Sequence, residues 1–174
     1  MNRLRQLLLA LAAALALAAA PGCEPEGTKD AGGGAGATQP TNTAITSPLP
    51  DNGFRATLAP ADAPARMRAG ERGVVQVRVR NASQAAWPAM GEESGKFAIT
   101  LRNRWLATDG ERVINDMDGG TSLPYDIAPG AEVVMAIRVT APKEAGEYLL
   151  EFDMVQEQVN FFRERGSTPA RVNV

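Results

Sequence analysis

The residue types that most enzymes use for nucleophilic or metal chemistry are nearly missing from this sequence. It contains no histidine and a single cysteine, Cys23. Without an imidazole, Ser-His-Asp and Cys-His systems and ordinary zinc sites are excluded. Carboxylates remain as possible catalytic groups, as they are in glycoside hydrolysis. The composition therefore favours a protein that has no catalytic residue, metal or cofactor, with a small carboxylate-dependent hydrolase as an alternative.

Cys23 directly follows a leader that is typical of exported proteins. Two arginines precede an uninterrupted Leu/Ala run over residues 7–20, which is shorter than the roughly 20 apolar residues of a membrane-spanning helix. Residues 20–23, Ala-Pro-Gly-Cys, resemble the bacterial lipobox, whose cysteine is lipidated and becomes the mature N-terminus. The resemblance implies a signal peptide over residues 1–22, acyl groups on Cys23 and a lipid-anchored protein of the cell envelope.

The alternative for Cys23 is a free thiol near an ordinary signal-peptidase site, since Ala18 to Ala20 also fit such a site. A lone cysteine cannot form an internal disulfide, and an exposed thiol is a liability in an oxidising compartment. Lipidation accounts for both the position and the missing partner. Glu24 occupies the next position, and the lipoprotein sorting rule then implies delivery to the outer membrane where two membranes are present.

Composition divides the rest of the chain into a tether and one domain. Residues 23–50 are rich in Gly, Ala, Thr and Pro, with Ile45 and Leu49 as the sizeable apolar groups. So little apolar surface does not offset an ordering cost of about 1–2 kcal/mol per residue, and we expect a disordered tether. Residues 51–174 are long enough to bury a core of their own. The net charge of −2, with mixed signs, predicts no nucleic-acid partner, and we expect a monomer.

Apolar and polar residues alternate along most of residues 51–174, which predicts strands with one solvated face. In the run after Tyr148, Glu151 and Asp153 are expected to face water, and Tyr148 to form a tyrosine corner. We predict an all-β, immunoglobulin-like antiparallel sandwich of about seven strands. The main strands are expected at Val74–Arg80, Phe97–Trp105, Val133–Val139, Tyr148–Met154 and Ala170–Val174, with smaller pieces at Gly53–Leu58, Arg66–Arg68 and Arg112–Ile114.

Several segments of this domain are similar to a known family. Val77–Ser83 followed by Trp87-Pro88 resembles the V-x-N-x-G/S-x-x-x-W-P segment of immunoglobulin-like domains attached to bacterial glycosyltransferases and methyltransferases. These domains also resemble the four-tryptophan (FW) domain of selective-autophagy receptors. The resemblance covers most of residues 70–174 and implies a non-catalytic adaptor. It continues through Ile127–Val133, Val139–Pro142 and Gly146–Tyr148.

The segment 155–166 is the best candidate for a binding surface. Phe161 and Phe162 are flanked by Arg163 and Arg165, and aromatic residues and arginines are enriched at interface anchors. Adjacent positions of an extended chain point in opposite directions, so we expect one phenylalanine inside and the other outside. The alternative is a packed loop whose arginines pair with Glu157 and Glu164.

Trp87 allows two interpretations. It is expected to close one end of the sandwich as a core residue, but an exposed ring could stack on a sugar. Trp87 is therefore kept as a binding candidate, and a glycan-binding module is the alternative function. Trp105, the second tryptophan, is interpreted in the same way.

Two further motifs have structural explanations. Asp116 and Asp118 precede two glycines and could bind calcium through oxygen ligands, although a solvated loop explains the composition equally well. Asn81-Ala82-Ser83 has the form of a glycosylation acceptor, and we interpret it as turn chemistry at a strand end.

Taken together, these features predict an exported lipoprotein whose β-sandwich acts by binding. The expected partners are the membrane, through the lipid on Cys23, and a protein or other component of the envelope. A structural envelope protein without a specific ligand is a further alternative.

Overall fold

The computed structural model describes residues 41–174. The predicted signal peptide over residues 1–22, the predicted lipidation site Cys23 and the first part of the predicted tether lie outside these described residues. The described residues belong to one compact unit, Thr38–Val174. Among them, no helix has the length and apolar character needed to cross a membrane.

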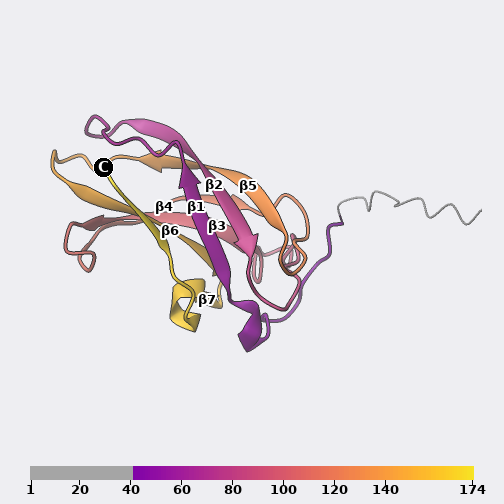
Figure 1. Ribbon diagram of the computed structural model, residues 1–174. Helices are drawn as coiled ribbons and strands as arrows, with labels where there is room; N and C mark the ends of the chain where they lie inside the picture. Colours follow the sequence, from indigo (N-terminus) through magenta and orange to yellow (C-terminus); the bar gives the residue numbers. More distant parts are fainter. Residues whose placement is uncertain (1–40) are drawn as a thin grey trace, which may run out of the picture. The chain divides into compact units, whose positions relative to one another are not determined.

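Two antiparallel sheets pack against each other, which confirms the predicted all-β sandwich (Figure 1). Non-consecutive strands are neighbours within both sheets, as in immunoglobulin-like folds. The first sheet has the order β1-β2-β5, with β1 Ala56–Ala61, β2 Arg72–Asn81 and β5 Glu132–Thr140. The second has the order β4-β3-β6-β7, and β8 also pairs with β6. Its strands are β3 Ile99–Ala107, β4 Val113–Ser122, β6 Tyr148–Gln156, β7 Asn160–Phe161 and β8 Ala170–Asn173, and the 3-10 helices are η1 Asp51–Gly53 and η2 Phe162–Arg165.

The predicted strands differ from the observed ones mainly at the sheet edges. The piece expected at Gly53–Leu58 begins inside η1, and β1 starts only at Ala56. Arg66–Arg68 is not a strand. Phe97 was expected to start β3, but it precedes the strand with a φ of 66°. Edge pieces are short and less apolar, so their alternation is a weaker signal than that of the central strands.

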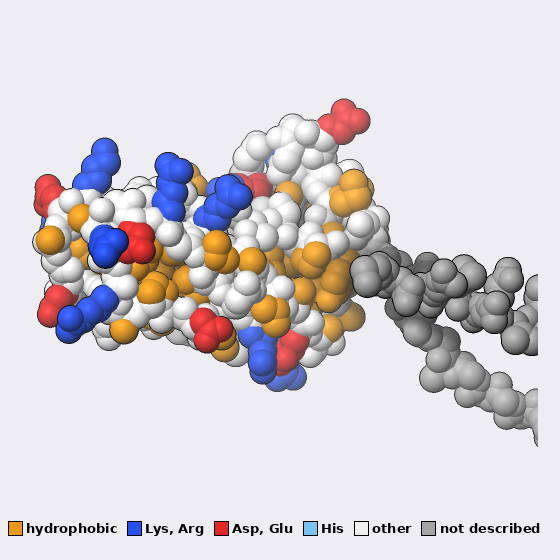
Figure 2. Space-filling view, turned by 90° about the horizontal axis from the view of Figure 1, so that it is seen from above, with side chains coloured by type: hydrophobic (Ala, Val, Ile, Leu, Met, Phe, Trp, Pro, Cys, Tyr) orange, Lys and Arg blue, Asp and Glu red, His pale blue; other side chains and the backbone are white. Residues whose placement is uncertain are grey.

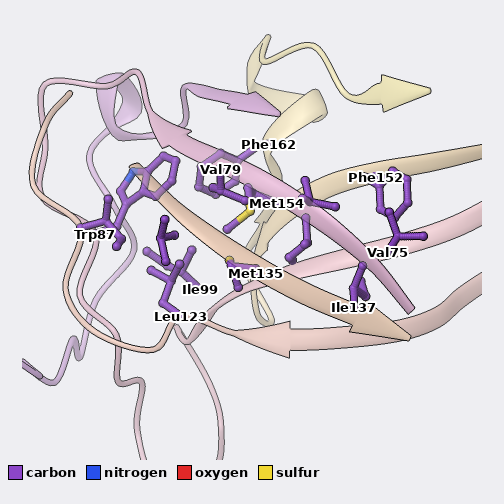
Figure 3. Packing of buried hydrophobic residues seen from close by; sticks show 14 of the residues in the cluster. Val75, Val79, Trp87, Ile99, Leu123, Met135, Ile137, Phe152, Met154 and Phe162 are labelled. Carbon is purple, nitrogen blue, oxygen red and sulfur yellow. The ribbon is translucent and has the colours of Figure 1, made fainter. Parts of the chain in front are cut away.

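The core lies between the sheets and is built by alternate strand positions. Val75, Val77 and Val79 of β2 are fully buried, and the residues between them are exposed. Phe152 and Met154 of the opposite sheet belong to the same cluster. Figure 3 shows Val75, Val79, Phe152 and Met154 together with other members of the cluster, such as Trp87, Ile99, Leu123, Met135, Ile137 and Phe162.

Asp116 and Asp118 lie in a strand, and the loop predicted for them is wrong. β4 extends to Ser122, and its pairing with β3 is shifted next to Asn103. The Asp118 carboxylate accepts hydrogen bonds from Asn103 Nδ2 at 3.0 Å and from the backbone N–H of Thr140. Within residues 41–174, no group of three or more Asp, Glu, Cys or His side chains is placed to hold a metal ion.

Gly119 explains why a sequence that is typical of a turn forms a strand here. A Cβ at this position would lie 2.2 Å from the carbonyl oxygen of Arg138 in β5. Two residues further, Thr121 Oγ1 donates a hydrogen bond to the carbonyl oxygen of Ala136 at 2.8 Å. β4 therefore belongs to the second sheet but also lies against the edge of the first. Only a residue without a side chain permits this approach of the two backbones.

The folded part begins before Asp51, which the sequence indicated as the start of the domain. Ala44 forms a parallel bridge with Met90, and the Asp126 carboxylate accepts hydrogen bonds from the backbone N–H of Thr43. Leu49 is 5% exposed and belongs to the core cluster. Residues 41–50 are thus held against the sandwich, chiefly by backbone hydrogen bonds that composition does not reveal.

The Asn81–Trp87 motif closes one end of the sandwich. Asn81 is fully buried, and its Nδ2 donates to the carbonyl oxygens of Ala85 at 2.8 Å and Ile127 at 2.9 Å. Its Oδ1 accepts hydrogen bonds from both the backbone N–H and the hydroxyl of Ser83. The interpretation of Asn81-Ala82-Ser83 as turn chemistry is therefore confirmed.

Tyr148 closes the opposite end, as the predicted tyrosine corner requires. Its hydroxyl donates a hydrogen bond to the carbonyl oxygen of Glu144 at 3.0 Å. Its ring packs edge-on against Trp105, with centroids 6.3 Å apart. The loop between β5 and β6 is therefore fixed by a residue at the start of β6.

Candidate functional site

Two of the predicted binding residues, Trp87 and Phe162, are completely buried. Their rings pack edge-on with centroids 5.2 Å apart, and Phe162 makes the same type of contact with Phe54 at 5.2 Å. Trp87 Nε1 donates a hydrogen bond to the carbonyl oxygen of Gly53 at 2.8 Å. Both rings form the core at this end of the sandwich, so neither is available as contact surface and their selection as binding residues is wrong. The expectation that Trp87 closes this end as a core residue is confirmed.

Neither tryptophan offers a ring face for stacking on a sugar. Trp105, like Trp87, has no exposed surface. The glycan-binding alternative depended on an exposed tryptophan ring. Because both rings are buried, nothing in the structure supports that alternative.

Phe161 and Arg163 remain at the surface as a stacked pair. The Arg163 guanidinium lies 3.8 Å from the centroid of the Phe161 ring. Arg163 Nη1 is also 3.1 Å from Asp153 Oδ2, and the Arg163 backbone N–H donates to the same oxygen at 3.3 Å. The inside-outside alternation expected for the two phenylalanines is observed, since Phe161 is half-buried and Phe162 is buried.

Arg165 is held by other partners than those predicted. Its Nη1 is 3.1 Å from Asp51 Oδ1, and its Nε and Nη2 donate to Asn160 Oδ1 at 3.1 and 2.9 Å. The expected partners are engaged elsewhere. Glu157 pairs with Arg102 at 2.7 Å, and Glu164 Oε2 accepts a hydrogen bond from the Phe161 backbone N–H. Arg165 thus connects η2 to η1. Its guanidinium group is used within the fold and is not free to bind a partner.

Glu151 and Asp153 of β6 are buried, and the prediction that they face water is wrong. Glu151 is 1% exposed because arginines from both neighbouring strands cover it. Its Oε1 is 2.6 Å from Arg104 Nε in β3, and its Oε2 is 2.8 Å from Arg171 Nε in β8. Asp153 is 3% exposed and pairs with Arg163. Apolar and polar residues therefore do alternate along β6, as predicted. The polar residues are nevertheless buried, because arginines that pair with them cover that side of the strand.

Burial raises the pKa of Asp153 from 3.8 to about 6. Hydrogen bonds and the positive charge of Arg163 act in the opposite direction, and the negative charge of Glu151 adds to the increase. Removing a carboxylate from water disfavours its charged form, and in this case the nearby arginine does not compensate fully. Asp153 is therefore a titratable carboxyl group that also holds Arg163, which stacks on Phe161.

A shallow hollow on the outer side of the five-stranded sheet brings these residues together with β4. It is lined by Arg102, Arg104, Asp116, Met117, Phe161 and Arg163, among others. Met117 is 55% exposed and has a φ of 53°, at the place where β4 and β3 change register. We call this group of six residues the Met117–Phe161 surface.

The carboxylates below this surface are arranged to hold arginines. Glu151 and Asp153 lie on one strand, and each is bound to at least one guanidinium group. A carboxylate hydrolase needs an acid and a base that face each other across a bond, and these two do not have that arrangement. The described residues thus offer a charged surface held by ion pairs, with apolar groups on it.

Little in the sequence indicates that Met117 belongs to this surface. It stands between two aspartates in a segment that resembles a loop. Its exposure depends on the register shift between β3 and β4, which follows from the pairing of distant strands. A methionine between acidic residues is the one local signal that could have pointed to it.

No family model matches this chain, and no curated protein matches it. Among solved structures, a CARDB domain of PF1109 from Pyrococcus furiosus is 13% identical, over 68% of this chain and 91% of that one, with a TM-score of 0.42. The sporulation control protein Spo0M from Bacillus subtilis is 14% identical, over 69% of this chain and 48% of that one, with a TM-score of 0.40. The ASH/PapD-like domain of human CEP192 is 10% identical, over 78% and 80% of the two chains, with a TM-score of 0.26. At these values, none of them indicates what this chain binds.

Proposed function

We propose that this protein is an exported lipoprotein, anchored by acyl groups on Cys23, whose β-sandwich is a non-catalytic module that binds a protein of the cell envelope. The observation that carries the binding part is Met117. It is an exposed apolar side chain on strained backbone, and it lines the same hollow as a phenylalanine that is stacked with an arginine. A non-glycine residue in the left-handed region costs energy, and such residues cluster at functional sites.

The residue types of the Met117–Phe161 surface support a protein as the partner. Methionine, aromatic residues and arginine are enriched at the centres of protein interfaces. Arg102, Arg104 and Arg163 all form ion pairs with acidic residues of β6 or of the turn after it. Their positions are therefore set before a partner arrives, which lowers the entropy cost of binding.

A lipid anchor would make modest affinity sufficient. Two or more acyl chains hold a protein at a membrane stably. Confinement to one surface raises the effective concentration of partners on the same membrane. A surface of this small size would then not need to bind tightly in solution.

Capture of the partner from native envelopes tests the binding surface. We expect Met117→Gln and Phe161→Ala each to weaken capture about tenfold or more, as loss of a central anchor residue does. Met90→Gln is the matched control, because Met90 is also a half-exposed methionine but does not line this hollow. Equal loss in the control, or no loss in the two test variants, would show that the partner binds elsewhere.

Acyl labelling in the native host tests the anchor. Cys23→Ala should abolish incorporation of labelled fatty acid and release the protein from the membrane fraction. Labelling that survives this substitution would remove the lipoprotein part of the proposal.

A further inference from the structure

The arginines of the two sheets differ in how they are used. On the five-stranded sheet and in η2, the guanidinium groups of Arg102, Arg104, Arg163, Arg165 and Arg171 form ion pairs. Within residues 41–174, Arg112 in the β3–β4 hairpin is exposed and forms none. On the three-stranded sheet, Arg72, Arg78, Arg80 and Arg138 form none within residues 41–174. All four are exposed. We call these four residues, with Val74 and Val134 between them, the arginine face.

The strand register places the arginine face on one side of the sheet. Arg138 of β5 lies opposite Val74 of β2, and Arg78 of β2 lies opposite Val134 of β5. The two valines are 57% and 58% exposed. Figure 2 views the molecule from the side on which β2 and β5 lie in Figure 1, and basic side chains stand out from it with apolar groups between them.

The charge of this face is opposite to that of the whole chain. The chain has a net charge of −2. Among the outward residues of β2 and β5, Glu132 is the acidic one, opposite Arg80. Four arginines and one glutamate leave a clear positive excess. Exposed guanidinium groups without a carboxylate partner are free to bind phosphate, often through two parallel hydrogen bonds.

We infer that the arginine face lies on the surface of an anionic lipid bilayer. The exposed residues of β1, β2 and β5 include no aromatic side chain, and those around the arginines are small, such as Ala59, Ala61 and Ala136. Protein interfaces usually depend on aromatic anchors seated in pockets. A sheet surface of arginines, valines and alanines suits a fluid layer of phosphate headgroups, which needs charge and no complementary shape.

The orientation that follows complements the proposed function. The outer faces of the two sheets of a sandwich point in opposite directions. With the arginine face on the lipid, the Met117–Phe161 surface points away from the membrane and toward a partner. The inference rests on the proposed function only for the presence of a membrane near the domain. It is tested without the lipid anchor, so the two proposals can fail separately.

Co-sedimentation with vesicles tests the inference, using residues 38–174 because they form a compact unit without Cys23. The probes are vesicles of phosphatidylcholine alone and vesicles that also contain about a third phosphatidylglycerol. We expect binding to the anionic vesicles only, weakening as salt is added. Arg78→Gln and Arg138→Gln should each weaken binding about fivefold. Replacement of all four arginines should reduce binding to the level measured on neutral vesicles.

Arg112→Gln is the matched control, because it removes one exposed positive charge from the hairpin of the other sheet. It should change vesicle binding by less than twofold. Thermal unfolding should be unchanged in all of these variants, since the arginines of the face have no ion-pair partner among the described residues to lose. Failure of the wild-type domain to bind anionic vesicles, or undiminished binding by the fourfold variant, would overturn the inference and make an acidic protein the next partner to test.

Discussion

Asp153 is the residue whose charge is most closely linked to the proposed binding surface. Burial raises the pKa of this carboxyl from 3.8 to about 6, and the charge of Arg163 only partly opposes the increase. The folded protein therefore binds this proton more tightly than the unfolded chain does. The stability gained from the proton is complete below about pH 4 and is lost as the pH rises through about 6. Its size is at most about 3 kcal/mol.

Asp153→Asn should remove this pH dependence because an amide does not titrate. Between about pH 4 and pH 7, the free energy of unfolding of the wild type should fall by up to about 3 kcal/mol relative to the variant. Urea unfolding at a series of pH values measures the difference. Asp109→Asn is a useful comparison. Hydrogen bonds from the backbone of Glu111 and Arg112 lower the pKa of Asp109, so its contribution has the opposite sign. A constant difference between wild type and Asp153→Asn across this range would contradict the account.

Individual residues were predictable where a local motif determines their role. The positions of Asn81 and Trp87 in one short motif predicted a turn and a core residue, and both are observed. The burial of Glu151 was not predictable, because it depends on Arg104 and Arg171, which the chain brings in from two other strands. Ion pairs between distant strands leave no periodic signal in the sequence.

At the scale of elements, β4 depends on Gly119 for its position between the two sheets. Gly119→Ala should lower the free energy of unfolding by about 1–3 kcal/mol or more, because the new Cβ has no room beside Arg138 in β5. Gly73→Ala in β2 is the control. A Cβ there would meet Met67 and Val139 at ordinary distances of 3.4 and 3.6 Å. Alanine should be neutral or raise stability by about 0.5 kcal/mol, since glycine weakens a strand interior.

Chemical denaturation of both glycine variants distinguishes these effects. Similar stability of Gly119→Ala and the wild type would show that β4 does not lie as close to β5 as described.

Among the elements, the main strands were predictable from the sequence because their alternation is long and unbroken. β4 was not, because its Asp-Gly-Gly sequence is equally typical of a turn, and the reason for Gly119 is a backbone on the other sheet.

For the whole molecule, the segment before Asp51 is part of the folded unit. Leu49 is buried in the core, and its backbone N–H donates to Gln156 Oε1 at 2.9 Å. Leu49→Ala should therefore cost about 2–4 kcal/mol in urea unfolding, as for other buried leucines. Ile45→Ala is the comparison, and a half-buried side chain at that position should cost less. Equal stability of Leu49→Ala and the wild type would mean that this segment is not held against the sandwich.

The arrangement of the molecule as a whole was predictable in outline, but its surfaces were not. Two amphipathic sheets must bury their apolar faces against each other, which defines the sandwich. Which polar residues remain free depends on register and pairing between strands. Phe161 was a predicted site residue and lies at the surface, whereas Met117 and the unpaired arginines became visible only once β2, β4 and β5 had been placed.

Site-specific photo-crosslinking in the native envelope tests the binding function most directly. A photoreactive amino acid is placed at Met117, on the proposed binding surface, and separately at Met90, an exposed position outside it. The account predicts that the probe at position 117 forms an adduct with one reproducible protein, and that the probe at position 90 does not. Identical adducts from both positions, or no protein adduct from position 117, would contradict it.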